Sequence, residues 1–242
     1  MAARSKKKAA RAAPAPAPPA AAAAAVKKKT VVLVDDHPLV RTGLAQLINR
    51  QDDLAVIGEA DSAAAAISAV DKLKPDLAVV DISLDDRNGI ELLKDLVVRA
   101  PKLNVLMLSM HPESLYAERA LRAGAKGYIM KQEAPDKVLV ALRRIVAGDV
   151  YVSDAIAAKM LKSMTDRRGS QPHESPVERL SDRELEVFRY IGKGFGTREI
   201  AEKLFLSVKT VETHREHIKA KLKLANKGEL LRYAVQWVAD QE

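Results

Sequence analysis

The sequence predicts a doubly wound α/β domain built on a five-stranded parallel sheet, followed by a smaller all-α domain of four helices. Between residues 30 and 147, apolar strand-like runs and helical segments alternate five times, which is typical of a parallel sheet covered by helices on both faces. Residues 180–242 show only helical patterns, with several helix-start signals. The chain of 242 residues is long enough for about two domains, at roughly 100–200 residues each.

Residues that start and end helices separate the elements of the first domain. Strands are expected at 30–34, 54–59, 76–80, 104–108 and 127–130. Helices are expected at about 38–50, 62–74, 89–99, 113–123 and 135–147. Pro38, Pro112 and Pro135 stand at helix starts, while Gly124 and Gly148 follow helix ends. Parallel strands joined in this way require right-handed crossovers.

The second domain is expected to contain four helices. A capping box beginning at Ser181 opens the first helix, and the glycines of 192–196 end it. Thr197 is expected to cap a short second helix and Ser207 a longer third one. The last helix should span about 227–239. Residues 151–179 between the domains form a connector, with a possible short helix near 153–161.

The positive charge of the chain is concentrated in its first residues. Residues 1–29 contain eight Lys and Arg residues and no acid, so their charge of +8 equals that of the whole chain. Their Ala, Pro and Lys composition offers little to bury and predicts a disordered tail. The tail is either a solvated spacer or an arm that binds DNA non-specifically, as it resembles the tails of linker histones.

Composition excludes several classes of site. The chain has no cysteine, so disulfides, thiolate metal sites and cysteine nucleophiles are impossible. No apolar run approaches the roughly 20 residues that a membrane helix needs, so no membrane insertion is expected. These features predict a protein of the cytoplasm.

Polar side chains follow four of the predicted strands. Asp81 ends one strand, the pair Asp35 and Asp36 follows another, and Ser109 and Lys131 follow two more. The carboxyl ends of parallel strands lie at one edge of the sheet, where open α/β sheets bind ligands. Carboxylates, a hydroxyl and an ammonium group around one aspartate predict a site that accepts a phosphoryl group.

With these motifs, residues 30–150 resemble the flavodoxin-like receiver domain of two-component signalling. Residues 180–242 resemble a LuxR-type helix-turn-helix domain, and the whole chain resembles the NarL/FixJ family of response regulators. The resemblance implies a transcription regulator and not an enzyme. A sensor histidine kinase would phosphorylate Asp81, and phosphorylation would control dimerisation and binding to promoter DNA. RNA polymerase is a further partner that this class of protein implies.

The same resemblance assigns a metal site and a switch. Mg²⁺ would be held by Asp36 and Asp81, through water by Asp35, and by the backbone carbonyl of Ser83; magnesium prefers such oxygen ligands.

Lys131 would pair with the phosphoryl group, and the Ser109 hydroxyl would hydrogen-bond to it. Ser109 and Tyr128 would move when Asp81 is phosphorylated. The alternative for Tyr128 is an ordinary core aromatic residue.

Two positions after Asp81 depart from related patterns. Asp85 occupies a place where many receivers have proline. Ser83 occupies the place where haloacid-dehalogenase-like phosphatases have an acid/base aspartate, which disfavours an enzyme with sustained turnover.

A regulator that works without phosphorylation is disfavoured because the residues of the site are intact. A further hypothesis is that Ser83 and His111 border the path of the water that removes the phosphoryl group.

The third helix of the second domain is the candidate DNA-reading element. One face is expected to pack inward through Val208, Val211, Ile218 and Leu222. The opposite face suits a major groove. Candidate DNA contacts, to bases or phosphates, are Thr197, Lys209, Thr210, Glu212, Thr213, Arg215, Glu216 and Lys219. The last helix, with Leu230, Leu231, Ala234, Val235 and Trp237, is either a dimer contact or part of the domain core.

Overall fold

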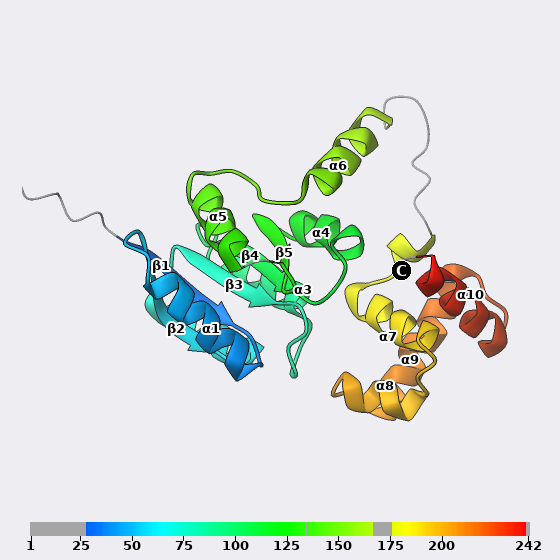
Figure 1. Ribbon diagram of the computed structural model, residues 1–242. Helices are drawn as coiled ribbons and strands as arrows, with labels where there is room; N and C mark the ends of the chain where they lie inside the picture. The colour runs from blue at the N-terminus through cyan, green and yellow to red at the C-terminus, as the bar shows by residue number, and fades with distance from the viewer. Residues whose placement is uncertain (1–27, 134, 167–175, 241–242) are drawn as a thin grey trace, which may run out of the picture.

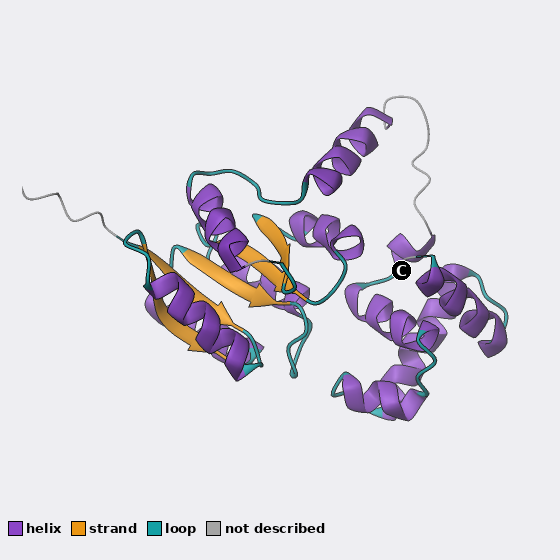
Figure 2. Cartoon of the chain, viewed as in Figure 1, coloured by secondary structure: helices purple, strands orange, loops and turns teal. Residues whose placement is uncertain are grey.

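The computed structural model describes residues 28–133, 135–166 and 176–240. It contains an α/β domain followed by an all-helical domain, as Figures 1 and 2 show. The predicted fold class is therefore confirmed. The predictions for the tail up to residue 27 and for residues 167–175 concern parts of the chain outside the described residues.

The sheet has five parallel strands in the order β2-β1-β3-β4-β5. Its strands are β1 (Lys29–Val34), β2 (Leu54–Ala60), β3 (Leu77–Asp81), β4 (Asn104–Ser109) and β5 (Gly127–Met130). From β1 the chain first adds β2 on one side of the sheet and then β3, β4 and β5 on the other. The carboxyl ends of β1 and β3 therefore meet at the switch point of the sheet, where ligands bind in open α/β folds.

Helices cover both faces of the sheet (Figure 1). They are α1 (Pro38–Asn49), α2 (Ala63–Leu73), α3 (Gly89–Arg99), α4 (Glu113–Arg122) and α5 (Pro135–Val146). Side chains of β1 alternate between the faces: Val31 and Leu33 pack with α1 and α5, whereas Val32 and Val34 pack with α2, α3 and α4. This period of two explains why the strands of a sheet buried on both faces are continuously apolar.

The second domain consists of a 3₁₀ turn and four helices. They are η1 (Pro176–Arg179), α7 (Asp182–Gly192), α8 (Thr197–Lys203), α9 (Val208–Leu222) and α10 (Lys227–Ala239). The connector helix α6 (Asp154–Asp166) exists and is longer than predicted.

The helix starts of this domain follow the predicted signals with one exception. Ser181 forms its capping box with Glu184, and Ser207 accepts a hydrogen bond from the backbone of Thr210. The prediction that Thr197 caps α8 is wrong. Gly196 is the cap, because its N–H donates to the Glu199 carboxylate at 2.7 Å, and Thr197 is the first helical residue.

The structure confirms that the last helix is part of the domain core, whereas its role as a dimer contact stays a prediction. Leu230 and Ala234 are fully buried, and the Trp237 ring lies 5.4 Å from that of Phe188 in α7. Leu231 and Val235 are 45% and 46% exposed on the other side. One side of α10 therefore belongs to the domain core, and the other side is exposed.

None of the helices in the described part of the chain combines the length and apolar character needed to span a bilayer.

Replacing Gly89 by alanine is expected to destabilise the α/β domain by about 2 kcal/mol, within the usual range for steric changes in a packed site. An added Cβ would lie 1.9 Å from the backbone oxygen of Asp81, which is too close for any real contact. The matched control is Gly43→Ala, whose Cβ meets nothing within 4 Å. In a helix that control should be neutral or stabilising by up to about 1 kcal/mol. Urea unfolding measures both variants, and equal stabilities would contradict the expectation.

Candidate functional site

The ends of the strands bring the predicted charged residues together. The Lys131 ammonium nitrogen lies 2.7 Å from Asp81 Oδ2 and 2.7 Å from Asp35 Oδ2. Asp35 and Asp81 are only 3% and 2% exposed. Two buried carboxylates thus share one cation at the carboxyl edge of β1, β3 and β5.

Burial and charge act in opposite directions on these groups. Burial raises the pKa of Asp81, and the nearby Lys131 charge partly offsets that increase. Burial alone would lower the pKa of Lys131, but the charge of Asp81 and the hydrogen bond to Asp35 outweigh it and raise that pKa. Lys131 therefore stays protonated and stabilises negative charge at Asp81.

The acidic groups fit a hard divalent cation. Ligand atoms of Asp35, Asp36, His37 and Asp81 all lie within 4.8 Å of one another. Asp81 Oδ1 is buried and accepts no hydrogen bond from the described residues, so a cation would satisfy it. Carboxylate oxygens are the donors that Mg²⁺ prefers. His37 was not among the predicted site residues, although it directly follows the aspartate pair; its Nδ1 lies 2.6 Å from Asp36 Oδ1.

Asp85 and Asp86, in the loop between β3 and α3, make different contacts. Asp86 accepts hydrogen bonds from the Ala63 N–H with both oxygens, at 3.0 and 2.9 Å. It thereby ties the β3–α3 loop to the start of α2. Asp85 is exposed, and slight desolvation together with the neighbouring Asp36 carboxyl group raises its pKa. The position that carries proline in many receivers thus adds a carboxyl group beside the acidic cluster.

The predicted switch residues are connected through His111. Ser109 is fully buried, and its hydroxyl oxygen accepts the His111 N–H at 3.1 Å. The Tyr128 hydroxyl donates to the His111 carbonyl oxygen at 2.8 Å, and Tyr128 is 1% exposed. Tyr128 therefore points inward in this structure, and both switch residues hold the backbone of the loop between β4 and α4.

The His111 side chain links the site to the second domain. Its Nε2 lies 2.9 Å from Ser83 Oγ, and its Nδ1 is hydrogen-bonded to the Arg189 guanidinium. A guanidinium can only donate, so Nδ1 accepts and the neutral ring carries its proton on Nε2. Burial and the charges of Arg189 and Lys193 lower the pKa of His111 to about 3. The sequence analysis did not identify Arg189, because no local pattern relates residues 78 positions apart.

The outward face of α9 carries most of the candidate DNA contacts. Lys209, Glu212, Thr213 and Glu216 are exposed, so the α/β domain does not cover them. Val211, Ile218 and Leu222 are buried as predicted, but Val208 is 41% exposed. Successive residues of an α-helix are about 100° apart around its axis, which places Val208 roughly 60° from the centre of the buried face. The prediction that Val208 packs inward is therefore wrong.

The remaining candidates differ in how freely they can reach DNA. Arg215 donates to Thr197 Oγ1 at 3.4 Å, and Lys219 is paired with Glu216 at 2.8 Å. The Thr210 hydroxyl is bonded to that of Ser207 at 2.7 Å, within the cap of α9. A depression of about 420 Å³ on this face is lined by Thr197, Lys209, Glu212, Thr213, Arg215, Glu216 and Lys227. Lys227, the first residue of α10, lines this depression although no sequence pattern placed it there.

Comparison with known proteins agrees with this arrangement. Residues 31–143 match the response regulator receiver domain, and residues 178–234 match the bacterial regulatory proteins of the luxR family. The chain is a response regulator with a receiver domain and a LuxR-type DNA-binding domain. The oxygen regulatory protein NreC of Staphylococcus carnosus is 37% identical over 209 residues, which are 85% of this chain and 96% of that protein. The chain therefore belongs to the NarL/FixJ family of transcription regulators.

Solved structures of response regulators are similar to this chain in fold. RcsB of Salmonella enterica serovar Typhimurium, bound to the promoter rprA with the phosphomimetic BeF₃⁻, is 27% identical with a TM-score of 0.58. The match covers 86% of this chain and 99% of that one. A LuxR-family response regulator from Aurantimonas is 33% identical with a TM-score of 0.53, covering 58% of this chain and 100% of that one.

His111 is expected to remain neutral throughout the range from pH 8 to pH 5. Its pKa of about 3 lies below the ordinary value of 6.5, so in the folded chain the ring is neutral above about pH 3 and can accept from Arg189. Its contribution to the contact between the domains is lost as pH falls from 6.5 towards 3. NMR titration of the imidazole resonances measures this pKa.

Two arginine variants test this explanation of the low His111 pKa, one at the arginine that contacts the ring and one at an arginine on another helix. Arg189→Ala should raise the pKa of His111, because a nearby positive charge is removed, whereas Arg198→Ala on α8 should leave it unchanged. A His111 that titrates near 6.5 in the intact chain would contradict the expectation.

Proposed function

We propose that the chain regulates transcription in response to phosphorylation of Asp81 by a sensor histidine kinase. The observation that carries the proposal is the buried Asp81 carboxylate, which has one oxygen paired with Lys131 and the other without a hydrogen-bond partner among the described residues. A phosphoryl group needs a nucleophile and positive charge around its oxygens. This edge of the sheet offers both.

The proposed reaction transfers a phosphoryl group to an Asp81 oxygen. The bond between phosphorus and the kinase histidine breaks as the new O–P bond forms, and the kinase imidazole leaves. Asp35, Asp36 and Asp81, with the Ser83 carbonyl, would hold Mg²⁺, which when bound neutralises charge on the phosphoryl oxygens. Lys131 stays protonated and pairs with the phosphoryl group, while the Ser109 hydroxyl donates to it.

We assign the receiver to residues 30–150, the connector to 151–179 and the DNA-binding domain to 180–242. Exposed Leu231 and Val235 of α10 supply an apolar surface for a homodimer on promoter DNA. Two modules on paired half-sites would increase affinity beyond that of one. The similarity to RcsB, solved in complex with promoter DNA, supports a role of this chain in DNA binding. RNA polymerase is the partner through which a bound regulator would act, in the cytoplasm.

Treatment with acetyl phosphate and Mg²⁺ is expected to add the mass of one phosphoryl group to the wild-type chain. Asp81→Asn should show no gain, since it lacks the nucleophile, and chelation of Mg²⁺ should abolish the gain in the wild type. Asp52→Asn, which changes an exposed acidic residue far from the site, is the matched control and should react normally. Intact-mass spectrometry measures the gain, and persistence of the gain in Asp81→Asn would refute this assignment.

Lys209→Ala and Thr213→Ala are each expected to weaken binding to the specific operator by about 1–3 kcal/mol, the usual value of a good base or phosphate contact. Both side chains are exposed on the outward face of α9. If Lys209 contacts a phosphate, its loss also lowers the salt slope by about one. Fluorescence anisotropy at several salt concentrations measures both effects. Lys72→Ala in the receiver is the control, and equal binding by all three variants would exclude this face as the DNA-reading surface.

A further inference from the structure

His37 lies beside the acidic cluster, and its backbone is held in place. Its N–H donates to Asp35 Oδ1 at 2.9 Å. Pro38, the first residue of α1, restricts the residue before it to an extended conformation, and His37 has φ −85° and ψ 108°. His37 is the N-cap residue of α1, but its side chain makes no capping hydrogen bond. The imidazole therefore has no part in starting the helix, and the backbone sets its position beside the cluster.

The ring nitrogen of His37 is spaced like a metal ligand. Its Nδ1 lies 2.6 Å from Asp36 Oδ1 and 3.3 Å from Asp35 Oδ1. Four side chains place one ligand atom each within 4.8 Å of one another: Asp35, Asp36, His37 and Asp81. Ligands bound at about 2.1 Å to one octahedral ion lie about 3 Å apart when adjacent and about 4.2 Å apart when opposite. The cluster is therefore close to the spacing that a single ion requires.

An unpaired buried oxygen distinguishes this cluster from an ordinary group of surface acids. Asp81 is 2% exposed, and its Oδ1 has no hydrogen-bond partner among the described residues. A buried carboxylate oxygen without a partner is costly, and a bound cation removes that cost. The His37 side chain, in contrast, is 63% exposed. An ion can therefore reach the cluster from solvent and keep water molecules as further ligands.

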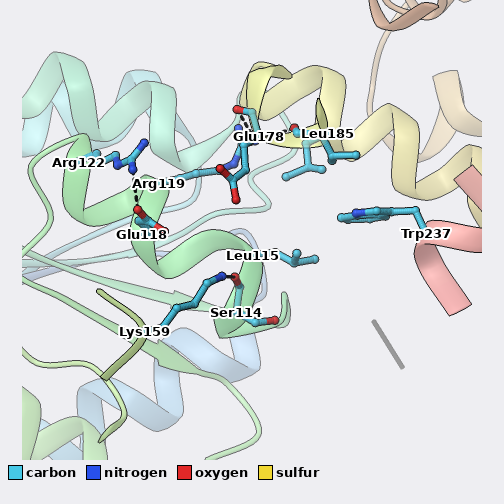
Figure 3. Close-up of a pocket in the computed structure, with 10 residues that line it drawn as sticks. Ser114, Leu115, Glu118, Arg119, Arg122, Lys159, Glu178, Leu185 and Trp237 are labelled. Atoms are coloured by element: carbon cyan, nitrogen blue, oxygen red, sulfur yellow. Dashed lines mark hydrogen bonds and ion pairs between the residues drawn. The ribbon is translucent and has the colours of Figure 1, made fainter. Parts of the chain in front are cut away.

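A cleft of about 250 Å³ between α4 and α7 shows charged groups that already have partners (Figure 3). Glu118 accepts from Arg122 at 2.6 Å, and Lys159 donates to the Ser114 carbonyl oxygen at 3.4 Å. Glu118 thus has a cation of its own, whereas the two buried aspartates at the sheet edge share one lysine. The sheet edge is therefore the better place for an added cation.

An imidazole ligand changes which ions a carboxylate site prefers. Mg²⁺ prefers oxygen ligands, whereas imidazole suits first-row transition ions, whose affinity rises from Mn²⁺ through Co²⁺ to Ni²⁺. In the structure Nδ1 of His37 carries the ring proton, because the Asp36 carboxylate can only accept. As a ligand, Nδ1 would present its lone pair and the proton would sit on Nε2. The ring stays neutral in both forms, so the exchange needs only a change of tautomer.

We propose that His37 is a nitrogen ligand that makes this edge of the sheet a site for divalent transition-metal ions, which bind there more tightly than Mg²⁺. The inference rests on the proposed function in one respect, that Asp35, Asp36 and Asp81 hold a divalent cation. Mg²⁺ would use the carboxylates alone, whereas a transition ion would use the same carboxylates and the imidazole. Because both occupy one place, a transition ion competes with Mg²⁺ for the site.

The test uses Co²⁺ as the probe, since Co²⁺ accepts oxygen ligands and also binds imidazole. In calorimetric titrations of the full-length chain, His37→Ala is expected to bind Co²⁺ at least about ten-fold more weakly than the wild type, the lower end of the usual changes around metal sites. Affinity for Mg²⁺ should change by less than about two-fold, because the oxygen ligands remain. His37→Gln is the second variant: it keeps a donor for Asp36 but has no nitrogen lone pair, and it should behave like His37→Ala.

Two control variants separate ligation from other effects. His217→Ala removes an imidazole that is 60% exposed and lies 3.8 Å from Glu184 Oε1 in the other domain, so it should bind Co²⁺ like the wild type. Asp85→Asn removes a carboxylate beside Asp36 but no nitrogen. It should weaken the binding of Co²⁺ and Mg²⁺ by the same factor, because charge attracts both ions alike.

Proton NMR identifies the ligand directly. Co²⁺ is paramagnetic, so the ring protons of an imidazole bound to it are shifted far outside their ordinary range. Such resonances should appear when Co²⁺ is added to the wild type or to His217→Ala, and they should be absent from His37→Gln.

The outcomes separate the inference from the proposed function. Unchanged Co²⁺ affinity in both His37 variants, an equal loss of Co²⁺ and Mg²⁺ affinity, or the absence of shifted ring resonances in the wild type would each overturn the inference. If acetyl phosphate still labels the wild type in that case, the inference alone fails. If the wild type gains no phosphoryl group, the proposed function fails, and the Co²⁺ titrations still decide the role of His37.

Discussion

The ion pair of Lys131 with Asp35 and Asp81 is the interaction on which the site depends. Two carboxylates buried at one edge of a sheet repel each other and have lost water, which is costly unless a cation and hydrogen bonds compensate. Lys131 compensates only in part, because Asp81 Oδ1 lacks a hydrogen-bond partner in the described chain. The edge of the sheet therefore retains excess negative charge and an unsatisfied oxygen, which favour a divalent cation.

Strand order makes this arrangement possible. Because β1 and β3 are neighbours at the switch point, the residues after them meet without any long loop, and the β5 end supplies Lys131 from beyond β4. Gly89 lets the next helix begin against the backbone of Asp81, where a Cβ would not fit. The position of the acidic cluster thus follows from the sheet, whereas its loops determine what surrounds the cluster.

The parts of the structure that follow from short-range patterns were predictable from the sequence. Apolar runs predicted the strands, and polar residues at their ends predicted which side chains gather. Long-range side-chain pairs were not predictable: nothing local to Arg189 or His111 indicates that they meet. The Thr197 and Val208 errors arise from helix ends, where one residue changes the cap or the buried face. Imidazole is not a usual magnesium ligand, so the place of His37 after the aspartate pair does not by itself predict a metal contact.

Besides the apolar cluster that the two domains share, their contact includes buried polar pairs, which respond to the receiver loops in a way that apolar packing does not. Apolar packing would attach α7 to the receiver whatever the state of Asp81, because hydrophobic burial does not respond to charge. Hydrogen bonds of Glu186 and Arg189 depend instead on the positions of Asn88 and His111, which belong to the loops beside Asp81. Such buried polar contacts are costly when they lose a partner. A shift of either loop that breaks one of these hydrogen bonds therefore makes the contact between the two domains less stable.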